Sequence, residues 1–138
     1  MNTGIPLFGR ILLTLIFLMA AYGHMSDPAG TQQYMASVGL PFTKLFVLGA
    51  IVLLLGGGLS ILLGYRVQWG ALALILFLVP TTLLFHRFWA VPAEQQVMQR
   101  IQFMKNLGLL GGLLMVLAHG PGDWSLDQVL EKKRPTVS

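Results

Sequence analysis

Cysteine is absent from this 138-residue sequence, and charged residues make up only 10% of it. Without thiols the chain forms no disulfide, uses no cysteine nucleophile and holds no iron–sulfur cluster through cysteine ligands. Any redox role therefore needs a bound cofactor or the cysteines of a partner protein. A soluble domain carries about 25% charged residues, so the small charged fraction argues against a soluble globular domain.

Long apolar runs explain the rest of the composition, which is 55% hydrophobic with a mean hydropathy of +0.73. A transmembrane helix needs about 20 mainly apolar residues, and four runs in the sequence approach that length. We therefore predict an all-α membrane protein, a bundle of four transmembrane helices in a single domain over residues 1–138. The predicted spans cover approximately residues 5–24, 45–64, 69–87 and 101–119.

Two short segments have the pattern of helices that lie in the membrane interface rather than cross the bilayer. Asp27 and Pro28 form an N-cap followed by a favoured first helical residue, which predicts a helix over about residues 28–38. The C-terminal tail, residues 120–138, contains Ser125 with a glutamine three residues later, which is a capping-box pattern. We expect a second interfacial helix there.

A proline interrupts the third apolar run. Pro80 should kink that helix, because it leaves the carbonyl one turn earlier without its usual N–H donor. Thr81 or Thr82 is close enough in sequence to help satisfy that carbonyl. We predict that the segment after this run, residues 90–99, is a polar loop.

Small residues recur at helical spacing in the second and fourth runs. Glycine and serine at i, i+4 positions let helix backbones approach closely in lipid. Lys105 shares a stripe with the fourth-run glycines, so we predict that it faces the interior of the bundle. The residues predicted to pack helices together are Gly56, Gly57, Ser60, Gly108 and Gly112.

Most of the polar side chains that could do chemistry fall at the same end of the predicted bundle. Ionisable groups cost roughly 2.5 to 3.5 kcal/mol at the centre of a membrane helix, so their retention on inward faces indicates a polar pocket just below the membrane surface. The candidate ligand-binding residues are His24, Asp27, His86, Arg87, Trp89, Gln102, Lys105 and Asn106.

These residue types suit a quinone headgroup or a small oxyanion. Lys105 and Arg87 would hold an anion or a carbonyl oxygen, His86 would exchange a proton, and Trp89 would stack on a ring. A metal or haem is not favoured, because no cysteine or second carboxylate joins the histidines at ligand spacing. The alternative is that these are ordinary boundary residues, with Lys105 paired to Asp27 or Glu94.

The nine basic residues are dispersed along the chain, so nucleic-acid binding is not expected. Arg10, within the first run, falls at helical spacing on one face with Thr14, Phe17, Ala21 and His24. Of the two interpretations, a role on that shared face or a side chain that snorkels to the interface, we favour snorkelling. Basic residues favour the cytoplasmic side of a membrane, and we predict that both termini lie there. The side with the termini would hold Arg10, Arg66, Lys132, Lys133 and Arg134, against Lys44, Arg87, Arg100 and Lys105 on the other.

Several motifs together resemble the DoxX family of small bacterial four-span membrane proteins. They are D-P-A-G-T-Q-Q-Y-M after the first run, G-G-L-S-I-L-L-G-Y-R closing the second, L-F-H-R-F-W closing the third and I-Q-F-M-K-N-L-G opening the fourth. The resemblance runs from about Arg10 to Asp127 and implies a four-helix bundle in the bacterial inner membrane, associated with redox and sulfur metabolism. This chain departs from the family pattern at Leu54 and His24, where many members carry a glutamate and a lysine.

The resemblance and the residues together lead to one main functional hypothesis. The protein would be an accessory or quinone-interacting membrane subunit that works with a separate redox partner. No self-sufficient catalytic constellation is visible, so whether it is itself an enzyme stays open. The alternatives are a non-catalytic structural or assembly protein, with glycine seams that pack against a second copy or a partner, and a small-solute transporter.

Overall fold

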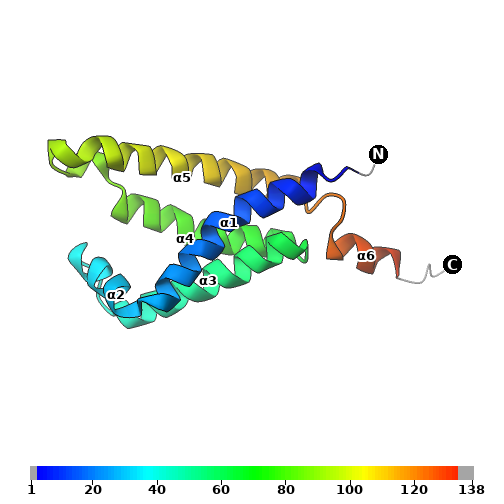
Figure 1. Cartoon of the computed structure of the whole chain (residues 1–138), viewed down its shortest axis with the longest axis horizontal. Helices are drawn as coiled ribbons and strands as arrows, with labels where there is room; N and C mark the ends of the chain where they lie inside the picture. The colour runs from blue at the N-terminus through cyan, green and yellow to red at the C-terminus, as the bar shows by residue number, and fades with distance from the viewer. Residues whose placement is uncertain (1–2, 134–138) are drawn as a thin grey trace.

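The computed structural model describes residues 3–133, which are mostly helical with no strand in that range (Figure 1). Arg134 and the four residues after it lie outside the described part, as do residues 1 and 2. In chain order the helices are α1 (Ile5–Ser26), α2 (Pro28–Ser37), α3 (Thr43–Leu63), α4 (Val67–Phe85), the 3-10 helix η1 (Phe88–Ala90), α5 (Ala93–His119) and α6 (Leu126–Lys132).

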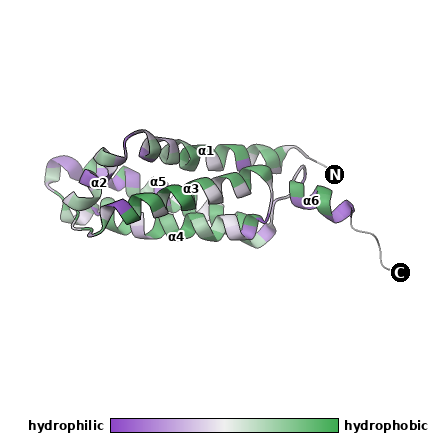
Figure 2. Ribbon diagram, turned by 90° about the horizontal axis from the view of Figure 1, so that it is seen from below, coloured by the Kyte–Doolittle hydropathy of each residue, from purple (hydrophilic) through white to green (hydrophobic). Residues whose placement is uncertain are grey.

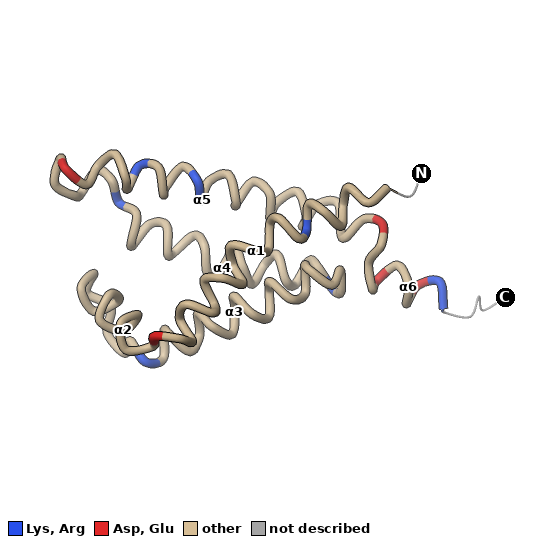
Figure 3. The backbone as a smooth tube through the Cα atoms, in the orientation of Figure 1, with Lys and Arg blue, Asp and Glu red and all other residues tan. Residues whose placement is uncertain are grey.

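Four helices are long and apolar enough to cross a membrane: α1, α3, α4 extended by η1, and α5. The predicted all-α membrane fold is therefore confirmed. Hydrophobic positions run along the lengths of these helices, whereas hydrophilic positions gather toward their ends and in the connections (Figure 2). Charged residues follow the same distribution (Figure 3), and α4 carries none over its whole length.

The helices pack in the order α1, α3, α4, α5, so that α3 and α4 form the centre of the bundle. The core between them is fully buried and consists of aliphatic side chains from every spanning helix, namely Ala21, Leu54, Ile61, Leu74 and Leu113. Large apolar side chains on the outer faces stay exposed, as suits helices surrounded by lipid.

The closest helix approach joins α3 to α4 at two glycines. A Cβ added to Gly57 would lie 2.8 Å from the Gly70 carbonyl oxygen, and one added to Gly70 would lie 3.0 Å from the Gly57 carbonyl oxygen. Neither backbone could come so near if these residues carried side chains. Ser60 contacts the same seam, and its hydroxyl donates to the Tyr65 carbonyl oxygen at 2.7 Å.

The prediction that other glycines pack between helices is wrong for two positions. No atom outside the helix lies within 4 Å of a Cβ position at Gly56 or Gly108, so neither packs between helices of this chain. Gly112 makes a looser contact, with Leu13 Cδ1 3.1 Å from its Cβ position. Lys105 and Gly108, one turn apart at the start of the fourth-run stripe, are both exposed, so Lys105 does not face the interior of the bundle as predicted.

The segment after α5 docks onto the end of the bundle that holds both described chain ends (Figure 1). Arg10 is 3% exposed, and its Nη2 donates to the Trp124 carbonyl oxygen at 2.6 Å. The snorkelling interpretation was therefore wrong, because the tail covers Arg10 before it reaches solvent. Ser125 caps α6 by accepting a hydrogen bond from the Gln128 N–H at 3.3 Å, as the capping-box pattern predicts.

The polar segment before the fourth span is mostly helical, which corrects the predicted loop. Helix α5 begins at Ala93, directly after Pro92, rather than at about residue 101. Glutamate and glutamine are good helix formers, and no glycine or proline stands between Ala93 and the apolar part of the run. The helix therefore extends beyond the apolar segment, and its first two turns carry the polar residues.

Candidate functional site

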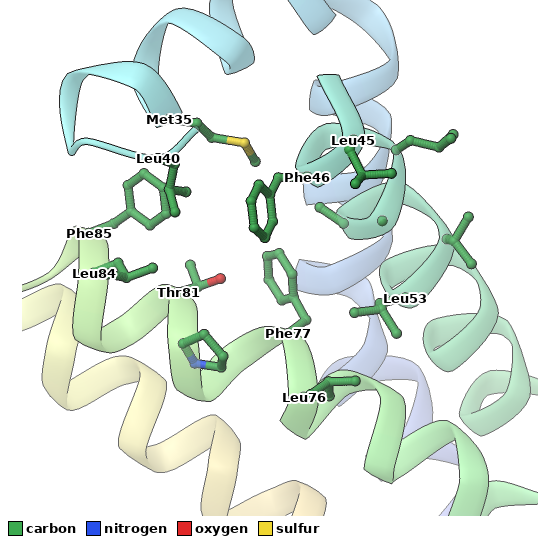
Figure 4. A pocket seen from close by; sticks show the side chains of 15 residues that line it. Met35, Leu40, Leu45, Phe46, Leu53, Leu76, Phe77, Thr81, Leu84 and Phe85 are labelled. Atoms are coloured by element: carbon green, nitrogen blue, oxygen red, sulfur yellow. The ribbon is translucent and has the colours of Figure 1, made fainter. Parts of the chain in front are cut away.

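A cavity of about 680 Å³ lies between α2, α3 and α4 (Figure 4). Its walls are almost wholly apolar, and three phenylalanine rings surround it. None of the eight ligand-binding candidates predicted from the sequence lines it. The lining residues are Met35, Leu40, Leu45, Phe46, Leu48, Gly49, Ala50, Val52, Leu53, Leu76, Phe77, Pro80, Thr81, Leu84 and Phe85.

The cavity exists because α3 and α4 touch closely at one point and carry small residues further along. Beyond the Gly57–Gly70 contact, the facing positions include Gly49 and Ala50 on α3 and Pro80 on α4, which leave space that larger side chains would fill. Helices α3 and α4 spread apart toward the end where α2 lies (Figure 1).

Helix α2 covers this open end. Met35 of α2 is buried against α3, and the Tyr34 ring lies 4.9 Å from the Phe85 ring of α4, centroid to centroid. Asp27 fixes the start of α2, because its Oδ1 accepts a hydrogen bond from the Gly30 N–H at 2.9 Å. The α1–α2 corner therefore positions a wall of the cavity.

The predicted candidates on α1 and α2 have local partners. His24 is half-buried near the end of α1, and its Nδ1 lies 3.3 Å from the Thr31 hydroxyl oxygen. Asp27 is occupied by the N-cap of α2. Both residues thus contribute to the corner between these helices.

The candidates at the start of α5 form a second, separate group. His86, just after α4, has its Nδ1 2.9 Å from Gln99 Oε1. Lys105 Nζ donates to Gln102 Oε1 at 2.5 Å, one turn earlier on the same helix. This lysine has no carboxylate partner within the described residues 3–133, so the predicted pairing with Asp27 or Glu94 is not formed.

The aromatic candidate belongs to a small cluster on the outside of this corner. Trp89 meets the Phe88 and Phe103 rings edge-on, with centroid distances of 5.2 and 5.8 Å. The Arg100 guanidinium lies over the Phe88 ring at 5.3 Å, a cation–π contact. Arg87 is exposed. These contacts fix the α4–α5 connection.

Asn106 is the one buried candidate. Its Nδ2 donates to Thr82 Oγ1 at 2.9 Å, and Thr82 in turn donates to the Leu78 carbonyl oxygen at 2.7 Å. This hydrogen bond between two buried side chains links α5 to α4.

The eight candidates therefore share one end of the bundle but do not form a common pocket. Helices α1 and α5 approach each other at Leu13 and Gly112, then diverge toward the end of α1, which carries His24, and the start of α5 (Figure 1). Helices α3 and α4, with the apolar cavity beside them, lie between the two groups. Among residues 3–133, no three His, Asp or Glu side chains lie close enough to hold a metal ion.

Sequence reasoning did not find the cavity. Its best signal was the combination of Pro80 and Thr81 in one run with Gly49 and Ala50 in the preceding one. That pattern does not indicate that the small residues of the two runs face each other. A helix in lipid is apolar on all sides, so its sequence shows no polar and apolar faces from which its rotation could be predicted.

The four apolar helices define an integral, multi-pass membrane protein. The DoxX family model matches residues 5–87, more than half of the chain, and the chain belongs to the DoxX family. This match spans α1 to the end of α4 and so contains every residue that lines the cavity. Lys105 and Asn106 lie beyond it.

Two similar proteins come from Escherichia coli K12. Inner membrane protein YqjF is 40% identical over 128 residues, 92% of each chain, and inner membrane protein YphA is 32% identical, covering 88% of this chain and 87% of its own. With four apolar helices and these relatives, the chain is an inner-membrane protein.

A more distant relative is eukaryotic. A Surfeit locus protein 4 homolog of Schizosaccharomyces pombe is 28% identical over 96% of this chain, which corresponds to 39% of the yeast protein. No solved structure is significantly similar to the chain.

Proposed function

We propose that this DoxX-family protein binds a membrane-soluble molecule of the quinone class in the cavity between α2, α3 and α4, as an accessory subunit beside a separate redox protein. The observation that carries the proposal is the cavity itself. Its volume of about 680 Å³ lies within the range of small-molecule sites, roughly 300 to 1,000 Å³.

The chemistry of the walls favours an apolar ligand that carries a ring. Phe46, Phe77 and Phe85 offer aromatic surfaces on which a flat ring can pack, and the aliphatic residues suit an isoprenoid chain. Because α3 and α4 cross the bilayer, a molecule dissolved in the lipid can reach the cavity without passing through water.

The absence of cysteine supports an accessory role. The chain has no thiol of its own to exchange electrons with a bound quinone. Electrons would therefore pass between the quinone and a partner protein, while this chain holds the quinone in place.

The test compares tryptophan substitutions at two exposed glycines of α3. Gly49 lines the cavity, and its Cβ position has open space, so Gly49→Trp places a ring in the cavity without a backbone clash. Gly56 lies two helical turns further on the same face, is equally open and does not line the cavity. Gly56→Trp is thus a matched control.

Binding of a quinone with a short isoprenoid tail is measured with the full-length protein in nanodiscs. Wild type, Gly56→Trp and Lys105→Ala bind alike, because neither substituted position lines the cavity, whereas Gly49→Trp loses binding. Equal binding by Gly49→Trp and Gly56→Trp would refute the cavity as the site. If Lys105→Ala alone bound the quinone more weakly, that result would instead support the polar site predicted from the sequence.

A second candidate function, a structural or assembly role, has one observation in its favour. Gly108 and Gly111 on α5 have no atom within 4 Å of their Cβ positions, so a helix of a second copy could approach there. Native mass spectrometry in mild detergent would then detect an oligomer that Gly108→Leu dissociates. A monomer under all detergent conditions would exclude this role for the α5 glycines.

The orientation of the bundle is also a proposal. Both described chain ends lie at the same end of the bundle (Figure 1), and the excess of basic residues on that side favours the cytoplasm. A cysteine placed at Thr3 should be protected from an impermeant maleimide in intact cells. Labelling of Thr3→Cys without lysis would contradict this orientation.

A further inference from the structure

We propose that the ligand of the α2–α3–α4 cavity carries a hydroxyl group, which is held between the Thr81 side chain and the backbone carbonyl of Leu76. This inference rests on the proposed function and makes it more specific, since it defines the polar chemistry of the bound molecule. Two observations support this inference: Pro80 removes the normal donor to the Leu76 carbonyl, and the Thr81 hydroxyl has no side-chain hydrogen bond among the described residues. Leu76, Pro80 and Thr81 all line the cavity.

Pro80 creates the free acceptor. In an α-helix the N–H of residue 80 would donate to the carbonyl of residue 76, but proline has no N–H and its ring pushes that carbonyl aside. No side chain of residues 3–133 donates to the Leu76 carbonyl in its place. Leu76 and Pro80 both line the cavity, so the helical turn that contains this carbonyl runs along the cavity wall.

Thr81 supplies the second group. Among residues 3–133 it is the only polar residue that lines the cavity, and Figure 4 shows its hydroxyl pointing into the space. Thr82, the next residue, uses its hydroxyl to bond the Leu78 carbonyl oxygen at 2.7 Å. Within the described chain the Thr81 hydroxyl makes no such bond. The sequence indicated that one of the two threonines would satisfy the carbonyl freed by Pro80, and neither does.

A single hydroxyl group on the ligand can hydrogen-bond to both the Leu76 carbonyl and the Thr81 hydroxyl. It donates its hydrogen to the Leu76 carbonyl and accepts a hydrogen bond from Thr81. In a hydrocarbon environment, where water does not compete, leaving these groups unpaired is costly. An ionised carboxylate does not fit, because it has no hydrogen to donate and no Lys or Arg lines the cavity.

The ligand class is therefore an apolar body with one hydroxyl at the point that meets Thr81. A quinol with an isoprenoid tail has this chemistry, and so does a long-chain alcohol derived from lipid. The experiment separates these two sources with two matched probe pairs, an alkyl hydroquinone with the alkylbenzene of equal chain length, and a fatty alcohol with the corresponding alkane.

Affinities are measured for wild type, Thr81→Val and Thr81→Ser in nanodiscs. The measured quantity is the ratio of dissociation constants within a pair, compared between variants, so that differences in lipid partitioning of the probes cancel. In wild type at least one hydroxylated probe is favoured, and Thr81→Val reduces that ratio roughly tenfold, whereas Thr81→Ser preserves it. The unhydroxylated probes bind all three proteins equally.

Pro80→Ala gives an independent reading. It restores an N–H opposite the Leu76 carbonyl and should also reduce the preference for the hydroxylated probe. A preference limited to the hydroquinone pair identifies a quinol. A preference limited to the alcohol pair identifies a lipid alcohol, which keeps the hydroxyl site but overturns the quinone class of the proposed function. If the ratio of dissociation constants within each probe pair is the same in wild type, Thr81→Val and Pro80→Ala while the probes still bind, the hydroxyl inference is overturned and the proposed binding function is not. Failure of every probe to bind overturns the proposed function.

Discussion

Replacing Gly57 by alanine destabilises the bundle, whereas the same replacement at the neighbouring Gly56 stabilises it. The two glycines are adjacent in α3, but only Gly57 meets α4. A Cβ at Gly57 would lie 2.7 Å from Leu74 Cγ and 2.8 Å from the Gly70 carbonyl oxygen, while a Cβ at Gly56 meets nothing within 4 Å. One methyl group therefore has opposite effects at the two positions.

The magnitude follows from two terms. Alanine is favoured over glycine within a helix by about 1 kcal/mol, and both variants gain this amount. Overpacking costs about 1–3 kcal/mol where the contact is with a backbone that cannot rotate away, and only Gly57→Ala has this cost. Because the helix-propensity gain cancels in the comparison, Gly57→Ala should be less stable than Gly56→Ala by about 1–3 kcal/mol.

The assay is unfolding of the purified protein by sodium dodecyl sulfate in mixed micelles, followed by circular dichroism. The free energy of unfolding is compared for wild type and both variants. Gly58→Ala serves as an intermediate case, because its Cβ meets the flexible end of the Leu18 side chain at 2.7 Å. Equal free energies for Gly56→Ala and Gly57→Ala would refute the close α3–α4 contact, and with it the geometry that opens the cavity.

Three further contacts give predictions. Thr82→Val leaves the buried Asn106 amide without its acceptor and lowers the free energy of unfolding by about 1 kcal/mol in the same titration, and an unchanged value would exclude this bond as a link between α4 and α5. Arg10→Leu removes the donor to the Trp124 carbonyl, so limited proteolysis cleaves the α5–α6 connection faster; equal cleavage rates would show that Arg10 does not hold it. Asp27→Ala removes the N-cap of α2 and speeds hydrogen exchange of the α2 amides by an amount equivalent to about 1 kcal/mol. Asp27→Asn keeps the hydrogen-bond acceptor and therefore the wild-type exchange rate. Faster exchange in both variants would show that the charge of Asp27, rather than its hydrogen bond, stabilises α2.

The sequence was sufficient to predict the membrane fold, because transfer into lipid depends on apolar length and composition. The capping residues Asp27 and Ser125 also predicted the starts of α2 and α6, since N-cap chemistry is local. The start of α5 was missed because hydropathy reports where a helix is apolar, not where it begins, and the polar turn after Ala93 continues the helix outside the apolar run.

The candidate site could not be predicted in the same way. Lys105 lies on the same helical stripe as several glycines, and we predicted that it faces the core because we assumed that small residues face inward. In the structure the buried side of α5 is instead the one that carries Asn106 and Leu113. In lipid both faces of a helix are apolar, so rotation depends on which backbones approach most closely. The close approach at Gly57 and Gly70 is a property of two segments together, and neither segment shows it alone.

The burial of Arg10 was also missed because it depends on a contact between distant parts of the chain. Its position within an apolar run predicted a side chain that reaches the interface, which is the usual solution for a lone arginine. In the structure the carbonyl of Trp124, more than a hundred positions later in the chain, provides the acceptor. A tertiary contact of this kind depends on the fold of the tail and has no local sequence signal.

The measurement that tests the central claim most directly is the mass of whatever molecule remains bound to the purified protein. Native mass spectrometry of wild type and Gly56→Trp should find one small apolar molecule per chain, and Gly49→Trp, which fills the cavity, should have none. The same bound mass in Gly49→Trp as in wild type, or none in any of the three proteins, would contradict the claim that the space between α2, α3 and α4 is a binding site.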